Sequence, residues 1–103
     1  MIKVTMTNEK NNVDIAIQGH ALEAPYGHDV VCAAVSVLFA QLQVSLRNTH
    51  ADDDGDIAKL HALVSDAGDV RMIASFQAMI EQLAEQYPKN VSFETVNANG
   101  GQG

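Results

Sequence analysis

One cysteine lies shortly after two histidines in the first third of the chain, and these residue types can support nucleophilic catalysis. Cys32 is the only cysteine, and His20 and His28 precede it. Because a single cysteine cannot form an intrachain disulfide, its role is packing, metal binding or thiol chemistry. Many cysteines simply fill a hydrophobic core. The residues and secondary structure around Cys32 are therefore needed to distinguish these three roles.

The local pattern favours thiol chemistry. Asp29 is a typical helix N-cap, and it predicts a helix from Val30 to about Arg47 with Cys32 in its first turn. Free amide groups and the positive end of the helix dipole favour a thiolate there and could hold an oxyanion. His20 ends a predicted strand, so it could fold back, accept the thiol proton and deliver it to a leaving amine. These are the parts of an acyl-transfer site.

Three other histidines are weaker candidates for the base. His28 lies four residues before Cys32, but it precedes the predicted cap, where its side chain is expected to face solvent. His50 and His61 fall in a weakly patterned segment and are interpreted as surface or strand residues. The sequence therefore favours His20 without eliminating His28.

Metal binding is an alternative that the spacing does not favour. The cysteine, the two histidines near it and Asp29 match none of the usual paired-ligand patterns of zinc sites. The Asp52-x-Asp54-x-Asp56 run resembles the start of a calcium loop, but Ile57 occupies the glycine position and Leu63 that of the closing glutamate. We interpret this run as a solvated acidic turn and expect no metal or cofactor.

The net charge restricts the possible partners. The chain has six Lys and Arg residues and thirteen Asp and Glu residues, so its formal net charge is −7 at pH 7. The basic residues are scattered along the sequence. A nucleic-acid surface needs clustered cations, so direct nucleic-acid binding is not expected. An acidic surface favours a basic partner, although it also serves solubility.

With 103 residues, the chain is expected to form a single domain over 1–96, followed by a flexible Gly-rich tail at 97–103. No apolar stretch is long enough to span a bilayer, and Met1 to Asn12 has no signal-peptide apolar region. With one cysteine as well, a cytoplasmic location is expected.

The elements that would position Cys32 follow from hydrophobic periodicity. Alternation predicts a hairpin over the first nineteen residues, a second hairpin over 48–63 and a last strand at 91–96. Asp66 or Asp69 should cap an amphipathic helix that Pro88 stops. The expected fold class is α+β, a small mixed β-sheet with two helices packed on one face.

The helix that carries Cys32 is expected to be largely buried, because apolar residues cover most of its circumference. One polar stripe remains, and Cys32 lies at its edge, one turn from both Asp29 and Ser36. Gln43 and Arg47 continue that stripe.

The same block resembles a known family, the ribosomal-processing cysteine proteases called Prp. The likeness rests on Gly19-His20-Ala21 followed by Tyr26-Gly27-x-Asp29-x-Val31-Cys32-Ala33-Ala34-Val35-Ser36, with Glu85-Gln86-Tyr87-Pro88 near the C-terminus. It covers the chain from Met1 to about Val96, and the middle segment is divergent.

The resemblance implies a small cytoplasmic homodimer that removes the N-terminal extension of a basic large-subunit ribosomal protein precursor, without a cofactor. It implies that Cys32 is the nucleophile and His20 the general base and acid. Asp29 and Ser36 would support them, Ser36 through a hydrogen bond, and Gly19 would allow the backbone to bend before His20. The alternative is a noncatalytic ribosome-associated or assembly-binding module that uses the same acidic surface.

The resemblance also implies a mobile substrate loop between the histidine and the helix. Many family members are rich in glycine there, whereas this sequence carries larger residues. The expected loop residues are Ala21, Leu22, Glu23, Ala24, Pro25, Tyr26 and Gly27.

Overall fold

Alternating apolar residues and two amphipathic segments build a layer of helices on a sheet. The computed structural model describes residues 1–19, 28–54 and 56–97. Along these ranges the elements are β1 (Ile2–Glu9), β2 (Asn12–Gln18), α1 (His28–Ser45), β3 (Thr49–Asp53), β4 (Ile57–Leu63), α2 (Ala67–Gln86) and β5 (Val91–Asn97). Both predicted hairpins and the last strand are confirmed, and β5 includes Asn97. Residues 98–103, most of the predicted tail, lie outside the described ranges.

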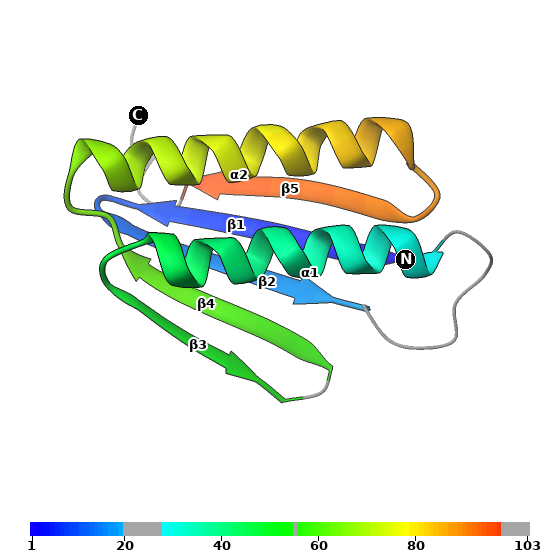
Figure 1. The fold of residues 1–103 in the computed structure, drawn as a ribbon, viewed down its shortest axis with the longest axis horizontal. Helices are drawn as coiled ribbons and strands as arrows, with labels where there is room; N and C mark the ends of the chain where they lie inside the picture. The colour runs from blue at the N-terminus through cyan, green and yellow to red at the C-terminus, as the bar shows by residue number, and fades with distance from the viewer. Residues whose placement is uncertain (20–27, 55, 98–103) are drawn as a thin grey trace.

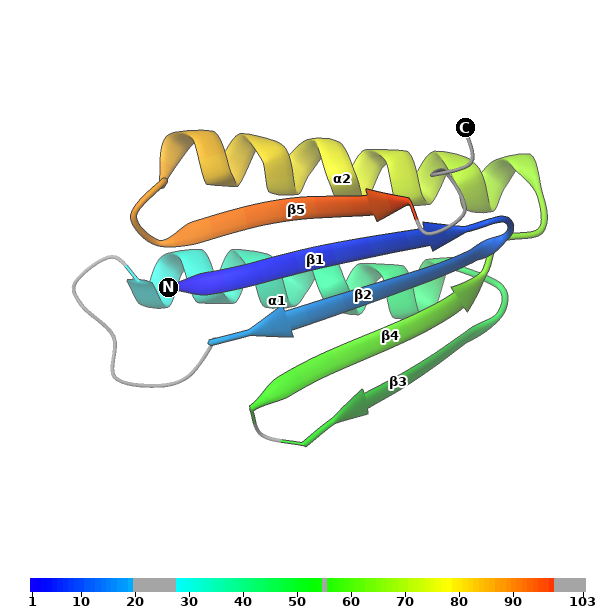
Figure 2. The same cartoon turned by 180° about the vertical axis from the view of Figure 1, so that it is seen from behind.

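The strands form one mixed sheet in the order β3-β4-β2-β1-β5. β1 pairs antiparallel with β2 and parallel with β5, while β4 pairs antiparallel with both β2 and β3. Figure 1 shows α1 and α2 side by side over one face, and the view from behind in Figure 2 shows the other face uncovered by helices. The predicted α+β fold, a small mixed sheet with both helices on one face, is therefore confirmed.

The hydrophobic core lies between the sheet and the helices. In β1, β2 and β4 every second residue faces the helices, and all of these residues except Asn8 are buried. Across the layer, α1 contributes Val31, Val35, Leu42 and Leu46, and α2 contributes Ile73, Phe76 and Ile80. This core fixes the face that α1 presents to the sheet, and so the direction of the other side chains on that helix.

Helix α1 differs from its prediction in two respects. It begins at His28, so Asp29 is its second residue and not its N-cap, and it ends at Ser45. It is also buried on one face only, since Val30, Val37 and Val44 are 68%, 65% and 82% exposed. The sheet and α2 cover one side of the helix, and apolar composition alone does not reveal how much of the circumference other elements can reach.

Carboxylates fix the start of α2. Asp66 is the N-cap and accepts a hydrogen bond from the backbone N–H of Asp69 at 2.9 Å, which satisfies one of the free amides of the first turn. Asp69 is buried and accepts from Ser65, and the Arg47 guanidinium donates to Asp66 at 3.1 Å. Both residues considered for the cap therefore act at this helix start, with Asp66 as the cap itself.

No helix in the described ranges is both long enough and apolar enough to cross a membrane.

Candidate active site

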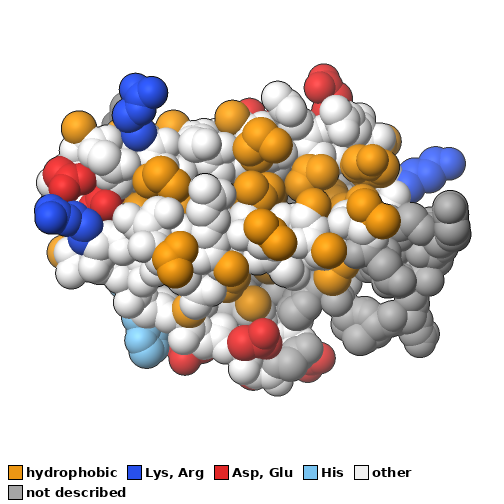
Figure 3. Space-filling model, viewed as in Figure 1, with side chains coloured by type: hydrophobic (Ala, Val, Ile, Leu, Met, Phe, Trp, Pro, Cys, Tyr) orange, Lys and Arg blue, Asp and Glu red, His pale blue; other side chains and the backbone are white. Residues whose placement is uncertain are grey.

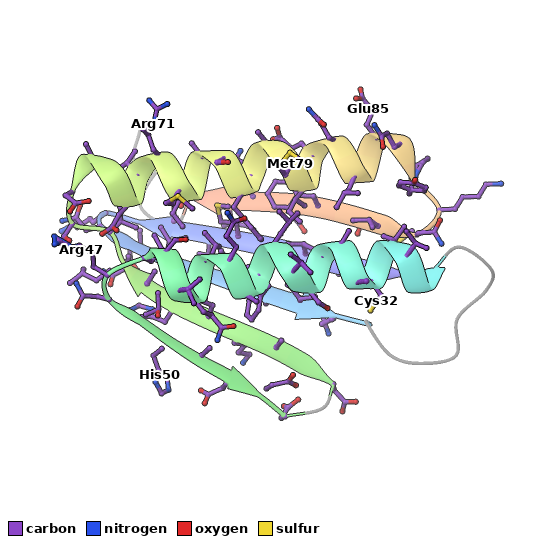
Figure 4. All side chains as sticks on the ribbon, viewed as in Figure 1. Cys32, Arg47, His50, Arg71, Met79 and Glu85 are labelled. Carbon is purple, nitrogen blue, oxygen red and sulfur yellow. The ribbon has the colours of Figure 1, made fainter. Side chains whose placement is uncertain are left out.

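Cys32 lies near the N-terminal end of α1 and is half-buried. It is the fifth residue of the helix and packs against the edge of the hydrophobic core. Its sulfur lies on the flank of α1 that points away from α2 (Figure 4). A side chain placed there can contact the core on one side and a ligand at the surface on the other.

The helix boundary changes the electrostatic argument for a thiolate. The first intrahelical hydrogen bond of an α-helix is donated by its fourth residue, so in α1 the described amides without an intrahelical acceptor are those of residues 28–30 and not that of Cys32. The prediction made Cys32 the third residue of a helix that starts at Val30, whereas Cys32 is the fifth residue of α1 and lies just beyond its first turn. Helical side chains tilt toward the N-terminus, so the sulfur still projects over that turn and its dipole.

The predicted base and the predicted substrate loop lie outside the described residues. This applies to His20 and to all loop residues from Ala21 to Gly27. Of Asp29 the structure describes only the backbone, as the second residue of α1. The positions that flank the loop are both described: β2 ends at Gln18, α1 begins at His28, and Figure 1 shows both at the same end of the molecule.

Gly19 is the last described residue before His20, and its backbone requires glycine. Its φ of +78° lies in the left-handed region, which side-chain-bearing residues avoid. A Cβ at this position would also collide with the carbonyl oxygen of Met1. The chain therefore leaves β2 through a bend that only glycine fits, immediately before the predicted base.

Ser36 lies one helical turn beyond Cys32 and is exposed. It lines a groove of about 340 Å³ together with Phe39 and Gln43 of the same helix. The rest of the lining comes from the sheet: Ile17, Ala51, Asp52, Asp53 and Ala58. The hydrogen bond predicted for Ser36 stays a prediction, while the groove itself is a feature that we did not predict.

Two signals in the sequence could have located this groove. Ser36, Phe39 and Gln43 follow Cys32 at spacings of 4, 7 and 11, which places all four on one helical stripe. Asp53 stands in a run interpreted as a solvated turn, yet it is the last residue of β3. Because consecutive aspartates show no alternation of apolar and polar residues, nothing in the sequence indicates that β3 extends into this run.

His50 and His61 lie on the sheet face opposite the helices. Nδ1 of His61 is 2.7 Å from Oδ1 of Asp14, and Nε2 of His50 is 3.4 Å from Oδ2 of Asp52. All four side chains are exposed. The interpretation of these histidines as surface strand residues is confirmed, and the sheet separates them from Cys32.

The acidic turn between β3 and β4 uses one carboxylate to hold its own backbone. Asp54 accepts from the backbone N–H groups of Ile57 and Asp56, each at 2.9 Å. These two hydrogen bonds hold the pKa of Asp54 below its ordinary value of 3.8. Among the residues that the structure describes, no three His, Cys, Asp or Glu side chains form a group suited to a metal ion.

Comparisons with known proteins agree with this architecture. A family model described as cysteine protease Prp matches residues 1–92. The ribosomal processing cysteine protease Prp of Mycoplasma pneumoniae is 35% identical over 99 residues, which cover 91% of this chain and 94% of that protein. Its counterpart from Staphylococcus aureus is 26% identical over 98 residues, covering 87% of this chain and 92% of the relative.

Solved structures share the fold. A crystal structure of a Streptococcus mutans protein superposes with a TM-score of 0.78 at 27% identity and covers 94% of this chain and 95% of that one. The S. aureus ribosomal processing protease Prp, solved with a substrate peptide, has a TM-score of 0.69 at 24% identity, with 92% and 99% covered. The match of the family model over nearly the whole chain shows that this protein belongs to the cysteine protease Prp family.

Proposed function

We propose that this protein is a cysteine endopeptidase that removes the N-terminal extension of a basic large-subunit ribosomal protein precursor. The observation that carries the proposal is the match to the Prp family over residues 1–92, which includes the only cysteine of the chain. The position of Cys32 supports it, because the side chain lies at the N-terminal end of α1 on the same stripe as a surface groove. The relatives named for ribosomal processing supply the substrate class.

The proposed mechanism uses Cys32 and His20 as a pair. His20 takes the thiol proton, and the Cys32 thiolate attacks the scissile carbonyl carbon to form a tetrahedral oxyanion. The peptide C–N bond then breaks, His20 gives its proton to the leaving amine, and a thioester remains on Cys32. The shortened protein leaves as this amine, so the thioester carries the N-terminal extension. Water deprotonated by His20 then attacks the thioester, which releases the extension as a free acid, and His20 returns the proton to the Cys32 thiolate.

Other residues would position this pair. The bend at Gly19 sets the direction in which the chain enters His20, so it restricts where the imidazole can lie. The free amides of residues 28–30 lie in the first turn of α1, where they would stabilise the oxyanion. Asp29 would complement the helix dipole in that turn, and Ser36 would orient a neighbouring group by a hydrogen bond.

The proposal also covers the charge of the substrate, the location of the enzyme and its oligomeric state. A net charge of −7 complements a basic ribosomal protein and would accelerate encounter. We place the enzyme in the cytoplasm, where a reducing environment keeps the thiol active. We also propose a homodimer, because an apolar strip remains exposed on the outer side of the two helices.

This apolar strip is defined by the groove between α1 and α2. It has a volume of about 500 Å³, and its lining consists of Val30, Ala33, Ala34, Val37, Leu38, Met79 and Leu83. Figure 3 shows hydrophobic side chains gathered over the two helices on this face. A continuous apolar patch rimmed by polar residues is typical of a protein interface.

Incubation of the purified protein with the extended precursor, followed by mass measurement of the products, tests the activity. We expect one cleavage that releases the N-terminal extension. Cys32→Ser should lower the rate by about 10⁴-fold or more, because the nucleophile and its base act as a unit. Circular dichroism of the variant shows whether the fold is kept. The mechanism would be contradicted if the wild-type enzyme left the precursor intact, or if a folded Cys32→Ser variant cleaved it at an undiminished rate. Binding of the precursor without cleavage would favour the noncatalytic module.

A further inference from the structure

The groove beside Cys32 has an apolar floor and two different walls. Ile17 of β2 and Ala58 of β4 are buried residues paired across the sheet, and they form the floor. On one side stands α1, with the half-buried ring of Phe39 between Ser36 and Gln43. This part of the groove is suited to an apolar side chain.

The second wall carries a carboxylate on the helix side of the edge strand. Asp53 pairs with Ala58 in the register of β3 and β4, and Ala58 pairs with Ile17. Residues paired across a sheet share a face, so Asp53 lies on the same side as the groove floor. Asp52 alternates to the other face, where it pairs with His50. Of the two aspartates that line the groove, Asp53 is therefore the one whose side chain the fold directs to the helix side of the sheet.

The groove continues the helical stripe of Cys32. At about 1.5 Å of rise per residue, Ser36 lies about 6 Å and Gln43 about 16 Å from Cys32 along the axis. An extended peptide advances about 3.3 Å per residue. A substrate whose scissile bond lies at the Cys32 sulfur would therefore have residues about two to five positions away beside these groups.

We propose that Asp53 is a specificity-determining residue that selects a lysine or arginine about two to five residues from the scissile bond. The cation pairs with the Asp53 carboxylate, and a neighbouring apolar side chain packs on Phe39 and the groove floor. The inference rests on the proposed function, since it assigns a substrate preference to the same site. The favourable interaction with a basic substrate would then come from one carboxylate on the helix side of β3, in addition to the net charge of the whole protein.

A peptide series tests this preference. The parent peptide spans the processing site, and lysine, glutamine or glutamate is placed in turn at each of the positions within about five residues of the scissile bond on either side. At one or more positions the wild-type enzyme should cleave the lysine peptide about threefold to tenfold more efficiently than the glutamate peptide, chiefly through KM. Raising the salt concentration should reduce the ratio, because exposed charges are screened.

Substitutions at Asp53 separate a direct role from general electrostatics. Asp53→Asn should bring the ratio near one, Asp53→Glu should preserve it, and Asp53→Lys should invert it. Glu85→Gln makes the same change of net charge on α2 and should leave the ratio unchanged. Thermal unfolding of each variant confirms that the fold is kept.

The outcomes distinguish this inference from the proposed function. Equal cleavage of all peptides at every position, abolished by Cys32→Ser, would overturn the role of Asp53 and leave the protease standing. A charge preference that persists in folded Asp53→Asn would do the same. Complete resistance of every peptide and of the precursor would overturn both.

Discussion

At the scale of single residues, Gly19 is required by geometry. A substitution to alanine would force a side chain into the left-handed region and against the Met1 carbonyl. We expect Gly19→Ala to lower the free energy of unfolding by about 2 kcal/mol or more, because both the strain and the collision must be relieved. Urea unfolding monitored by circular dichroism measures this change.

Gly68 provides the matched control for this substitution. It lies in the first turn of α2, and an added Cβ would find Oδ1 of Asp66 at 3.4 Å, an ordinary contact distance. Gly68→Ala should leave stability unchanged or raise it by up to about 1 kcal/mol, since alanine favours helix formation. Equal effects of the two substitutions would contradict the assignment of a special backbone at Gly19.

Asp54 predicts a pH dependence of stability. Its folded-state pKa lies below the ordinary value of 3.8, so its ionised form is favoured by folding. The ionised Asp54 carboxylate therefore stabilises the folded state fully well above pH 3.8, and this stabilisation is lost as the pH falls through the lower folded-state pKa. The difference in unfolding free energy between wild type and Asp54→Ala should therefore be larger at about pH 6 than below that window.

Urea titrations at both pH values measure this difference. Asp56→Ala is the control, because only its backbone N–H takes part in the Asp54 hydrogen bonds. A difference for Asp54→Ala that does not change with pH would show that the carboxylate charge is not what holds the turn.

At the scale of elements, the junction between α1 and α2 depends on one buried carboxylate. Asp69 is 2% exposed and accepts from the backbone N–H of Arg47 at 3.4 Å and that of Ser65 at 3.2 Å. Asp69→Ala would leave these donors without an acceptor and should cost about 2 to 3 kcal/mol of stability. Glu85→Gln, an exposed change on the same helix, should stay within about 0.5 kcal/mol. An equally small loss in Asp69→Ala, measured by urea unfolding, would refute this role.

The periodicity of the sequence predicted the elements well because each strand of the first hairpin buries one face. Ile2, Val4 and Met6 alternate with polar residues and are all buried. Helix α1 was harder to predict. Its exposed valines follow the same 3.6-residue period as its buried ones, so a pattern alone cannot separate a core face from an exposed face.

The part of the site that contains a rare residue type could be predicted from the sequence. The part that lies in a run of acidic residues could not, because such a run is also typical of an exposed turn. Cys32 stood out as the only cysteine, and the helix around it was expected. Asp53 shares its run with three other aspartates, so no pattern distinguished the strand residue facing the groove from the turn that follows. The pairing of β1 with β5 also had no local signal, because it joins the two ends of the sequence.

At the scale of the whole molecule, the apolar strip predicts self-association. Val37 is 65% exposed within the strip, and a two-fold interface would bury it in both copies. Val37→Lys should raise the dimer dissociation constant about a hundredfold or more, because each copy loses apolar burial and gains a charge to desolvate. Sedimentation equilibrium measures the change.

Val70 is the control for the interface, since it is an exposed valine of α2 outside the strip. Val70→Lys should leave the dissociation constant unchanged. A monomeric wild-type protein, or equal weakening by both substitutions, would exclude this surface as the dimer interface.

The position of β1 also determines when the chain can fold. β1 is made first, yet its neighbour β5 follows both helices, and Asn8 lies beside Asn97 across 89 positions. Such distant pairing slows folding, because a long loop must close before the contacts form. Until β5 arrives, β1 pairs only with β2, and its other edge lies unpaired beside an incomplete core. A nascent chain on a ribosome would thus emerge with the Cys32 segment already synthesised but without a finished sheet behind it, so the proposed activity would begin only after the last strand is released.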